Sequence, residues 1–122
     1  MLVSLIFIFI LLILVDSVYL FLIKDLFQKQ ILKIQNKPIQ INYIAAFLCY
    51  VFLTLGIYYF TNKSILKAFL LGIVIYGVYE TTTKALLRGW NWNIVIIDTL
   101  WGGILFSLVT FIKNRLITIY NY

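Results

Sequence analysis

Histidine is missing from this sequence of 122 residues, cysteine and proline occur once each, and only four residues are acidic. Without histidine, the His-based zinc, haem and catalytic-triad arrangements cannot be built. The single cysteine, Cys49, can form neither an internal disulfide nor an iron–sulfur cluster, and within an apolar run it is typical of small apolar filler. No phosphate-cradling glycine loop occurs, because WGG at 101–103 is short and lies within an apolar run. We therefore expect no metal or cofactor, and carboxylate chemistry remains.

Long hydrophobic runs dominate the chain instead. Hydrophobic residues make up 64% of it and charged residues 11%, against about 45–50% and about 25% in soluble domains. A soluble fold of this length could not bury so much apolar surface, so the excess must face lipid. The net charge of +6 could suggest nucleic acid. The basic residues, however, are scattered at the edges of apolar runs and form no basic stripe, so we expect no nucleic-acid partner.

Four apolar stretches are long enough to cross a bilayer as helices, which takes about 20 residues each. They are too continuous to be the alternating strands of a membrane β-barrel. The first has no basic leading segment and is too long for a signal peptide, so we expect it to be retained. The sequence predicts an all-α, multi-pass integral membrane four-helix bundle, one domain over 1–122, with both termini on one side. The expected spans are about 2–23, 41–60, 65–87 and 94–112.

The longest connection, residues 24–38, combines an apolar helical face with a row of lysines spaced four residues apart. This pattern predicts a short basic amphipathic helix that lies in the membrane interface and ends near Pro38. Two interpretations stay open: the lysines contact anionic lipid headgroups, or the segment is a solvated connector. The apolar residues are Phe27, Ile31 and Ile34, and the lysines are Lys29, Lys33 and Lys37.

Three of the four acidic residues fall within the expected spans. Asp16 lies late in the first, Glu80 late in the third and Asp98 early in the fourth. Each costs at least about 2.5–3.5 kcal/mol in mid-membrane on insertion scales. Because the fourth span runs opposite to the first and third, all three carboxylates are displaced toward the side of the long connection. We expect one acidic layer, which becomes a cluster if the helices face inward. The alternative is hydrogen-bonded joints between helices, worth about 0.6 kcal/mol each.

The residues around these carboxylates are polar or aromatic. Lys84 follows Glu80 by one helical turn, so the two can form an ion pair, and the threonine hydroxyls at 81–83 can donate to carboxylates. The candidates for binding a ligand or a proton are Asp16, Tyr19, Tyr79, Glu80, Thr83, Lys84, Asp98 and Trp101.

Two further patterns concern packing. Trp90 and Trp92 lie where an aromatic belt is expected at the membrane surface. Glycine permits close approach of membrane helices. The glycines that we expect at helix contacts are Gly72, Gly77, Gly102 and Gly103.

Five stretches match the motifs of a known family. They are DSVYL at 16–20, NYIAAFLCY at 42–50, YETTT at 79–83, RGW at 88–90 and DTLWGG at 98–103. On these motifs the chain resembles, over almost its whole length, the bacterial membrane family called domain of unknown function 2177. The resemblance implies a four-span membrane protein whose acidic residues occupy the positions of the family's motifs, and it supplies no activity.

The chain departs from the family pattern at three motif positions. Glu80 stands where the family has aspartate, so this carboxylate is longer by one methylene. Thr83 replaces an asparagine and Tyr19 replaces a tryptophan. The acid and hydroxyl character of the motif is retained.

Three hypotheses about function remain. In the first, the carboxylates bind or translocate a proton, a cation or a small polar ligand, and a homo-oligomer is expected because four helices are few for a carrier. In the second, the carboxylates act as acid and base of an enzyme that modifies a lipid. In the third, the protein is an accessory membrane subunit. A carrier predicts flux in liposomes, an enzyme predicts altered lipids in expressing cells, and an accessory subunit predicts a co-purifying partner.

Overall fold

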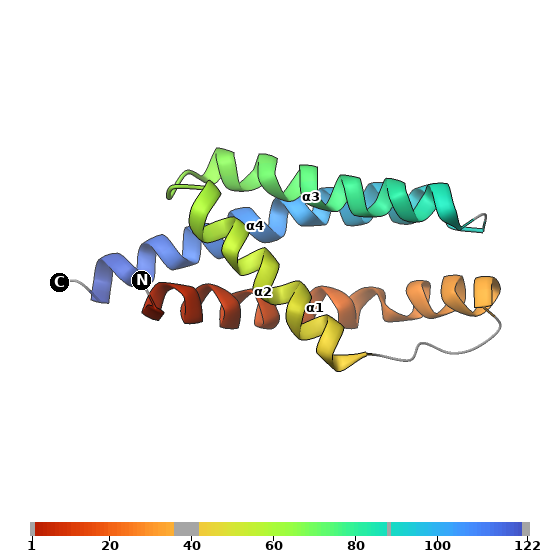
Figure 1. Ribbon diagram of the computed structural model, residues 1–122, viewed down its shortest axis with the longest axis horizontal. Coiled ribbons are helices and arrows are strands. Elements are labelled where there is room, and N and C mark those ends of the chain that lie inside the picture. Colours follow the sequence, from red (N-terminus) through yellow and green to blue (C-terminus); the bar gives the residue numbers. More distant parts are fainter. Residues whose placement is uncertain (1, 36–41, 88, 121–122) are drawn as a thin grey trace.

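The computed structural model describes residues 2–35, 42–87 and 89–120, and over these residues it consists of four helices without strands (Figure 1). All four helices are long and apolar enough to cross a membrane, which confirms the predicted all-α membrane fold. The start of the first helix and the end of the fourth lie at the same end of the molecule (Figure 1). The helices are α1 (Leu2–Gln35), α2 (Tyr43–Phe60), α3 (Ile65–Leu86) and α4 (Trp92–Tyr120).

Polar side chains mark where α2 and α3 begin. The side chain of Asn42 accepts a hydrogen bond from the amide of Ala45 at 3.1 Å and thereby caps α2. The Ser64 hydroxyl caps α3 in the same way, through the Lys67 amide at 3.2 Å. A cap satisfies one of the amides that the first helical turn leaves without a partner. These side chains therefore set the starts of α2 and α3, at positions that hydrophobicity alone does not define.

Helix α1 is longer than we expected and continues without a break over residues 24–35, which belong to the segment predicted to be a separate interfacial helix. Its 34 residues span about 50 Å, which exceeds a hydrocarbon core of about 30 Å. The predicted apolar face at 27–34 exists, but it packs against buried Trp90, Ile94 and Val95. The side-chain amide of Gln30 also donates a hydrogen bond to the Gly89 carbonyl. Residues 24–35 therefore extend α1 instead of forming a separate helix, because no proline or glycine interrupts them and because α4 supplies a partner for that face. The location of this segment in the membrane interface stays a prediction.

The lysines of this segment keep their predicted place on the opposite side. Lys29 and Lys33 are exposed, and their contact with anionic headgroups stays a prediction. Lys37 and Pro38 lie outside the described residues.

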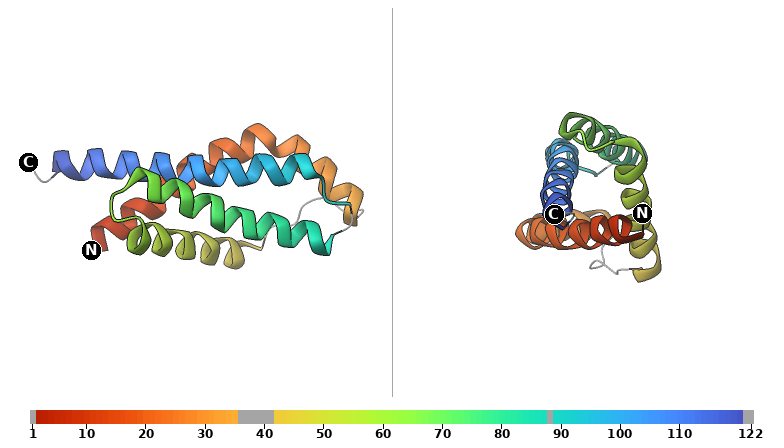
Figure 2. Two further views of the ribbon diagram at one scale, coloured as in Figure 1. Left: turned by 90° about the horizontal axis from the view of Figure 1, so that it is seen from above. Right: turned by 90° about the vertical axis from the view of Figure 1, so that its left-hand side faces the viewer.

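The helices are arranged around the bundle in the order α1, α4, α3, α2 (Figure 2, right). Helix α2 crosses α1 obliquely, and it lies nearest to α3 around the short turn that connects them (Figure 1). The apolar core between the helices is formed by Ile8, Leu12, Leu53, Ile57, Ala68, Leu105, Phe106 and Val109. Away from this core, toward the far end of α3, α2 and α3 diverge, and a cavity lies in that half of the molecule.

Helices α3 and α4 approach each other closely at glycines, as predicted for three of the four. A Cβ on Gly102 would lie 2.6 Å from the Gly72 carbonyl oxygen, and a Cβ on Gly103 would lie 2.8 Å from the Phe69 ring. A Cβ on Gly77 would make only an ordinary contact, 3.6 Å from the Thr99 methyl. The α3–α4 contact therefore depends on Gly72, Gly102 and Gly103, and it fixes the relative rotation of the helices that carry Glu80 and Asp98.

Gly72→Ala is expected to destabilise the bundle by about 1–3 kcal/mol. The added methyl would lie 2.9 Å from the Gly103 amide nitrogen and closer still to the Gly102 carbonyl, and neither backbone atom can move independently of α4. Thermal unfolding in detergent, followed by tryptophan fluorescence, measures the change. Gly77→Ala is the matched control and should unfold like the wild type. If the two variants unfold at the same temperature, the close contact does not contribute to stability.

Candidate functional site

A cavity of about 300 Å³ lies between all four helices, and the three intramembrane carboxylates line it. Asp16 is 7% exposed, Glu80 1% and Asp98 5%. The structure therefore brings together the acids that sequence placed in one layer. Apart from Cys49, the rest of the lining is aromatic or aliphatic, and it consists of Tyr19, Leu20, Phe27, Leu53, Ile75, Tyr76, Tyr79, Trp90 and Trp101.

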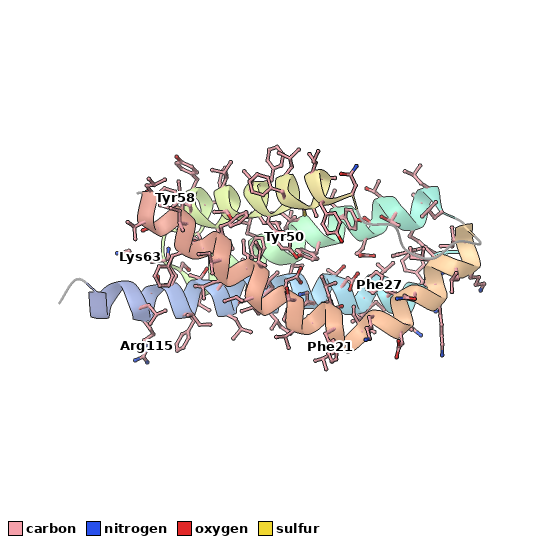
Figure 3. The ribbon with its side chains drawn as sticks, turned by 90° about the horizontal axis from the view of Figure 1, so that it is seen from below. Phe21, Phe27, Tyr50, Tyr58, Lys63 and Arg115 are labelled. Carbon is pink, nitrogen blue, oxygen red and sulfur yellow. The ribbon has the colours of Figure 1, made fainter. Side chains whose placement is uncertain are left out.

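Asp16 has a protein donor for each of its carboxylate oxygens. The Tyr50 hydroxyl, on α2 (Figure 3), donates at 2.6 Å to Oδ2. The Trp101 indole N–H, on α4, donates at 2.9 Å to Oδ1. A buried carboxylate that accepts hydrogen bonds at both oxygens is well compensated. Asp16 thus joins three helices and has little remaining capacity to hold a ligand.

Glu80 and Asp98 are placed differently, and we call these two groups the carboxyl pair. Oε2 of Glu80 accepts a hydrogen bond from the Trp90 indole N–H at 2.9 Å. Oδ1 of Asp98 accepts one from the Tyr19 hydroxyl. The other oxygen of each group receives no hydrogen bond from an N–H or O–H donor of the described residues. The two carboxyl groups lie within hydrogen-bonding reach of each other.

Two buried acceptor groups that face each other require something positive between them. They can share a proton, as paired carboxyl groups do in aspartic proteases, or they can hold a cation. Within the described part of the chain, no group of three or more acidic, cysteine or histidine side chains is placed to hold a metal ion. The carboxyl pair is therefore suited to a proton or to a cation held by few ligands.

A stacked ring pair connects Asp16 with the carboxyl pair. The ring of Tyr19 lies parallel to that of Trp101, with 4.4 Å between the centroids and 7° between the planes. Trp101 donates to Asp16, and Tyr19 donates to Asp98. This contact holds Tyr19 in the orientation in which its hydroxyl reaches Asp98.

Two predicted site residues do not reach the carboxylates. Lys84 Nζ donates to the Trp90 carbonyl at 2.6 Å and lies over the Trp92 ring, 5.4 Å from its centroid. The Thr83 hydroxyl donates to the Tyr79 carbonyl at 2.9 Å in its own helix. Lysine extends toward the end of a membrane helix, and helical threonine bonds to the preceding turn. The expected pairing of Glu80 with Lys84 is thus replaced by the Trp90 indole.

Trp90 was expected in the aromatic belt, and that prediction was wrong. Its side chain is 4% exposed and faces Glu80, whereas Trp92 is 60% exposed and fits the belt. The turn between α3 and α4 folds Trp90 back over the last turns of α3. Phe27 of α1 covers it from outside, with 6.0 Å between the ring centroids.

Tyr50 and Phe27 were not predicted as site residues, and Cys49 was expected only to fill space within a span. The signals for two of the missed partners were present, because Tyr50 ends the NYIAAFLCY motif and Trp90 ends the RGW motif. Nothing in the local pattern distinguishes Phe27 from a lipid-facing residue. Arg88, which begins the RGW motif, lies outside the described residues.

A family model for predicted membrane proteins, DUF2177, matches residues 1–114. The chain belongs to the DUF2177 family. Comparison with the curated proteins and with the solved structures finds no match.

The motif stretches of this DUF2177 protein converge on the cavity. They supply the three acids, the stacked rings of Tyr19 and Trp101, and the donors Tyr50 and Trp90. DTLWGG additionally supplies two of the glycines at the α3–α4 contact. The residues on which the family resemblance rests therefore surround one place in the fold.

Trp90→Phe is expected to lower the free energy of unfolding by about 1–3 kcal/mol, because it leaves an oxygen of buried Glu80 without its donor. Unfolding in detergent measures this change. Trp92→Phe removes an indole from an exposed position and keeps the ring beneath Lys84, so it should change stability by no more than about 0.5 kcal/mol. Equal effects of the two substitutions would show that the bond to Glu80 is unimportant.

Proposed function

We propose that this DUF2177 protein binds and exchanges a proton or a cation at the carboxyl pair, within the bilayer. The observation that supports this most strongly is the pair itself: two buried acids that face each other, each with one oxygen lacking a donor among the described residues. Burying carboxylates in a membrane is costly. A carboxylate that only joins helices is expected to resemble Asp16, where both oxygens accept a hydrogen bond.

The position of the carboxyl pair also favours exchange over permanent burial. Glu80 and Asp98 line a cavity of about 300 Å³ rather than a closed core, so a proton or cation has a path to them. Four helices offer few surfaces for alternating access, and we propose that transport uses a homo-oligomer.

The test uses purified protein in liposomes that contain a pH-sensitive dye. A potassium diffusion potential, negative inside, drives cations inward. We expect acidification of the lumen with wild-type protein, a much slower change with the Glu80→Gln/Asp98→Asn double variant, and wild-type rates with Asp25→Asn, whose side chain is exposed and outside the cavity. Wild-type rates equal to those of protein-free liposomes would contradict proton translocation.

Lipid mass spectrometry of expressing cells separates this proposal from the enzyme hypothesis. We expect the same lipids with wild-type protein and with Asp98→Asn. A lipid that forms only with the wild type would instead identify the protein as a lipid-modifying enzyme.

A further inference from the structure

The cavity opens toward lipid. Three of its lining residues, on three helices, are themselves exposed: Leu20 on α1 is 45% exposed, Tyr79 on α3 is 66% exposed, and Cys49 on α2 is exposed. We call these three residues the mouth. All three lie within the candidate membrane spans, where the surface of the protein faces hydrocarbon. A ligand that enters through the mouth must therefore dissolve in the bilayer.

The lining of the cavity is suited to positive charge. Aromatic faces attract cations within about 6 Å of the ring centroid, and the carboxyl pair lies among such rings. Among the described residues that line the cavity, none is basic, and Lys84, the lysine nearest in sequence, is turned toward the Trp90 carbonyl. The aromatic lining consists of Tyr19, Phe27, Tyr76, Tyr79, Trp90 and Trp101.

We propose that the cavity binds a lipophilic organic ammonium, with an aryl or alkyl group against the rings and the cationic nitrogen at Glu80 and Asp98. The ligand enters laterally through the mouth. This inference rests on the proposed cation binding at the carboxyl pair and specifies its ligand. Solubility in lipid follows from the position of the mouth. A positive charge is favoured by two facing acids, each of which has one oxygen without a donor among the described residues. A volume of about 300 Å³ accommodates one small aromatic ammonium.

The test is binding of N,N-dimethylbenzylamine to the protein in phosphatidylglycerol vesicles, because this amine dissolves in lipid in its neutral form and is an ammonium once protonated. Trp92→Phe serves as the background, so that the remaining tryptophans, Trp90 and Trp101, both line the cavity. We expect the probe to change tryptophan fluorescence saturably. Isobutylbenzene, its neutral counterpart of the same shape, should bind at least about tenfold more weakly, since it lacks the charge. Equal responses to the two compounds, or no saturable response to the ammonium, would overturn the proposal.

Variants locate the binding within the cavity. Glu80→Gln should weaken ammonium binding by about tenfold or more. Tyr79→Leu removes a ring at the mouth without disturbing a buried contact, and should weaken binding by about two- to fivefold. Tyr43→Leu is its matched control, because Tyr43 is 78% exposed and lies outside the cavity. If Tyr79→Leu and Tyr43→Leu weaken ammonium binding equally, the probe lies in the lipid and the proposal is overturned. This result does not depend on whether Glu80→Gln folds.

Two further arms identify the source of the ammonium and separate the two proposals. If phosphatidylcholine vesicles abolish probe binding, the ligand is the ammonium headgroup of a lipid. If binding is unchanged there, it is a free ammonium compound. Absence of probe binding with intact proton exchange at Glu80 and Asp98 would refute the ammonium ligand and leave the proposed function standing. If the wild-type protein neither binds the probe nor exchanges protons, both proposals are refuted.

Discussion

Asp98→Asn and Glu80→Gln are each expected to abolish cation exchange while leaving the fold intact or more stable. Both substitutions keep an oxygen that can accept the existing hydrogen bond, from Tyr19 in one case and from Trp90 in the other. Both remove one of the two facing carboxylates. The amide can then donate to the remaining acid, so the pair needs neither a proton nor a cation.

The magnitudes distinguish a functional pair from a structural one. Exchange should fall by about tenfold or more, while the free energy of unfolding stays equal or rises by about 0.5–2 kcal/mol, as is common when a strained functional group is relieved. Liposome flux and unfolding in detergent measure the two quantities on the same preparations. If both variants exchange cations like the wild type, the carboxyl pair only joins α3 to α4.

Asp16→Ala is expected to have the opposite profile, with the largest loss of stability among these variants. The substitution leaves the Tyr50 hydroxyl and the Trp101 indole N–H without their common acceptor. Each unsatisfied buried donor costs about 1–3 kcal/mol, and both contacts join α1 to another helix. We therefore expect a loss of about 2–6 kcal/mol in total.

Unfolding in detergent, followed by near-ultraviolet circular dichroism, measures this loss. Asp25→Ala is the control, because Asp25 is exposed on the same helix, and it should change stability by no more than about 0.5 kcal/mol. Asp16→Asn keeps one acceptor oxygen and should lie between the two. A stable Asp16→Ala protein without cation exchange would assign Asp16 to the binding site and contradict the structural role given to it here.

The sequence was sufficient to predict the features that depend on the length of the apolar runs and on the position of a residue along its helix. The apolar runs identify four spans, and the positions of Asp16, Glu80 and Asp98 along them place the acids at one level because helical rise is constant. Glycine at positions 72, 102 and 103 predicts close helix contacts, because no other residue permits backbones to approach so nearly.

Sequence was not sufficient for the features that depend on helix rotation and turn geometry. Asp16 and Asp98 have similar surroundings in the sequence, yet Asp16 is fully bonded and Asp98 is not, and only the rotation of three helices determines this. Trp90 and Trp92 are two residues apart and look alike as belt residues. The turn after α3 directs one to Glu80 and leaves the other exposed.

The extension of α1 shows a third limit. Hydrophobicity predicts how much of a helix lies in lipid, and it does not predict where the helix ends. Residues 24–35 continue the helix because they favour it and because Gln30 and the adjacent apolar face contact the α3–α4 turn and the start of α4. That contact covers Trp90, so the extension helps to form one end of the cavity.

Infrared difference spectroscopy of the protein in vesicles tests the central claim most directly, because a protonated carboxyl group absorbs separately from an ionised one. We expect the wild type to show a protonated-carboxyl band that shifts in heavy water and disappears in alkaline buffer. The band should persist in Asp25→Asn and be absent from the Glu80→Gln/Asp98→Asn double variant. A wild-type spectrum with no exchangeable carboxyl band from Glu80 or Asp98, in any buffer or with added cation, would contradict the account.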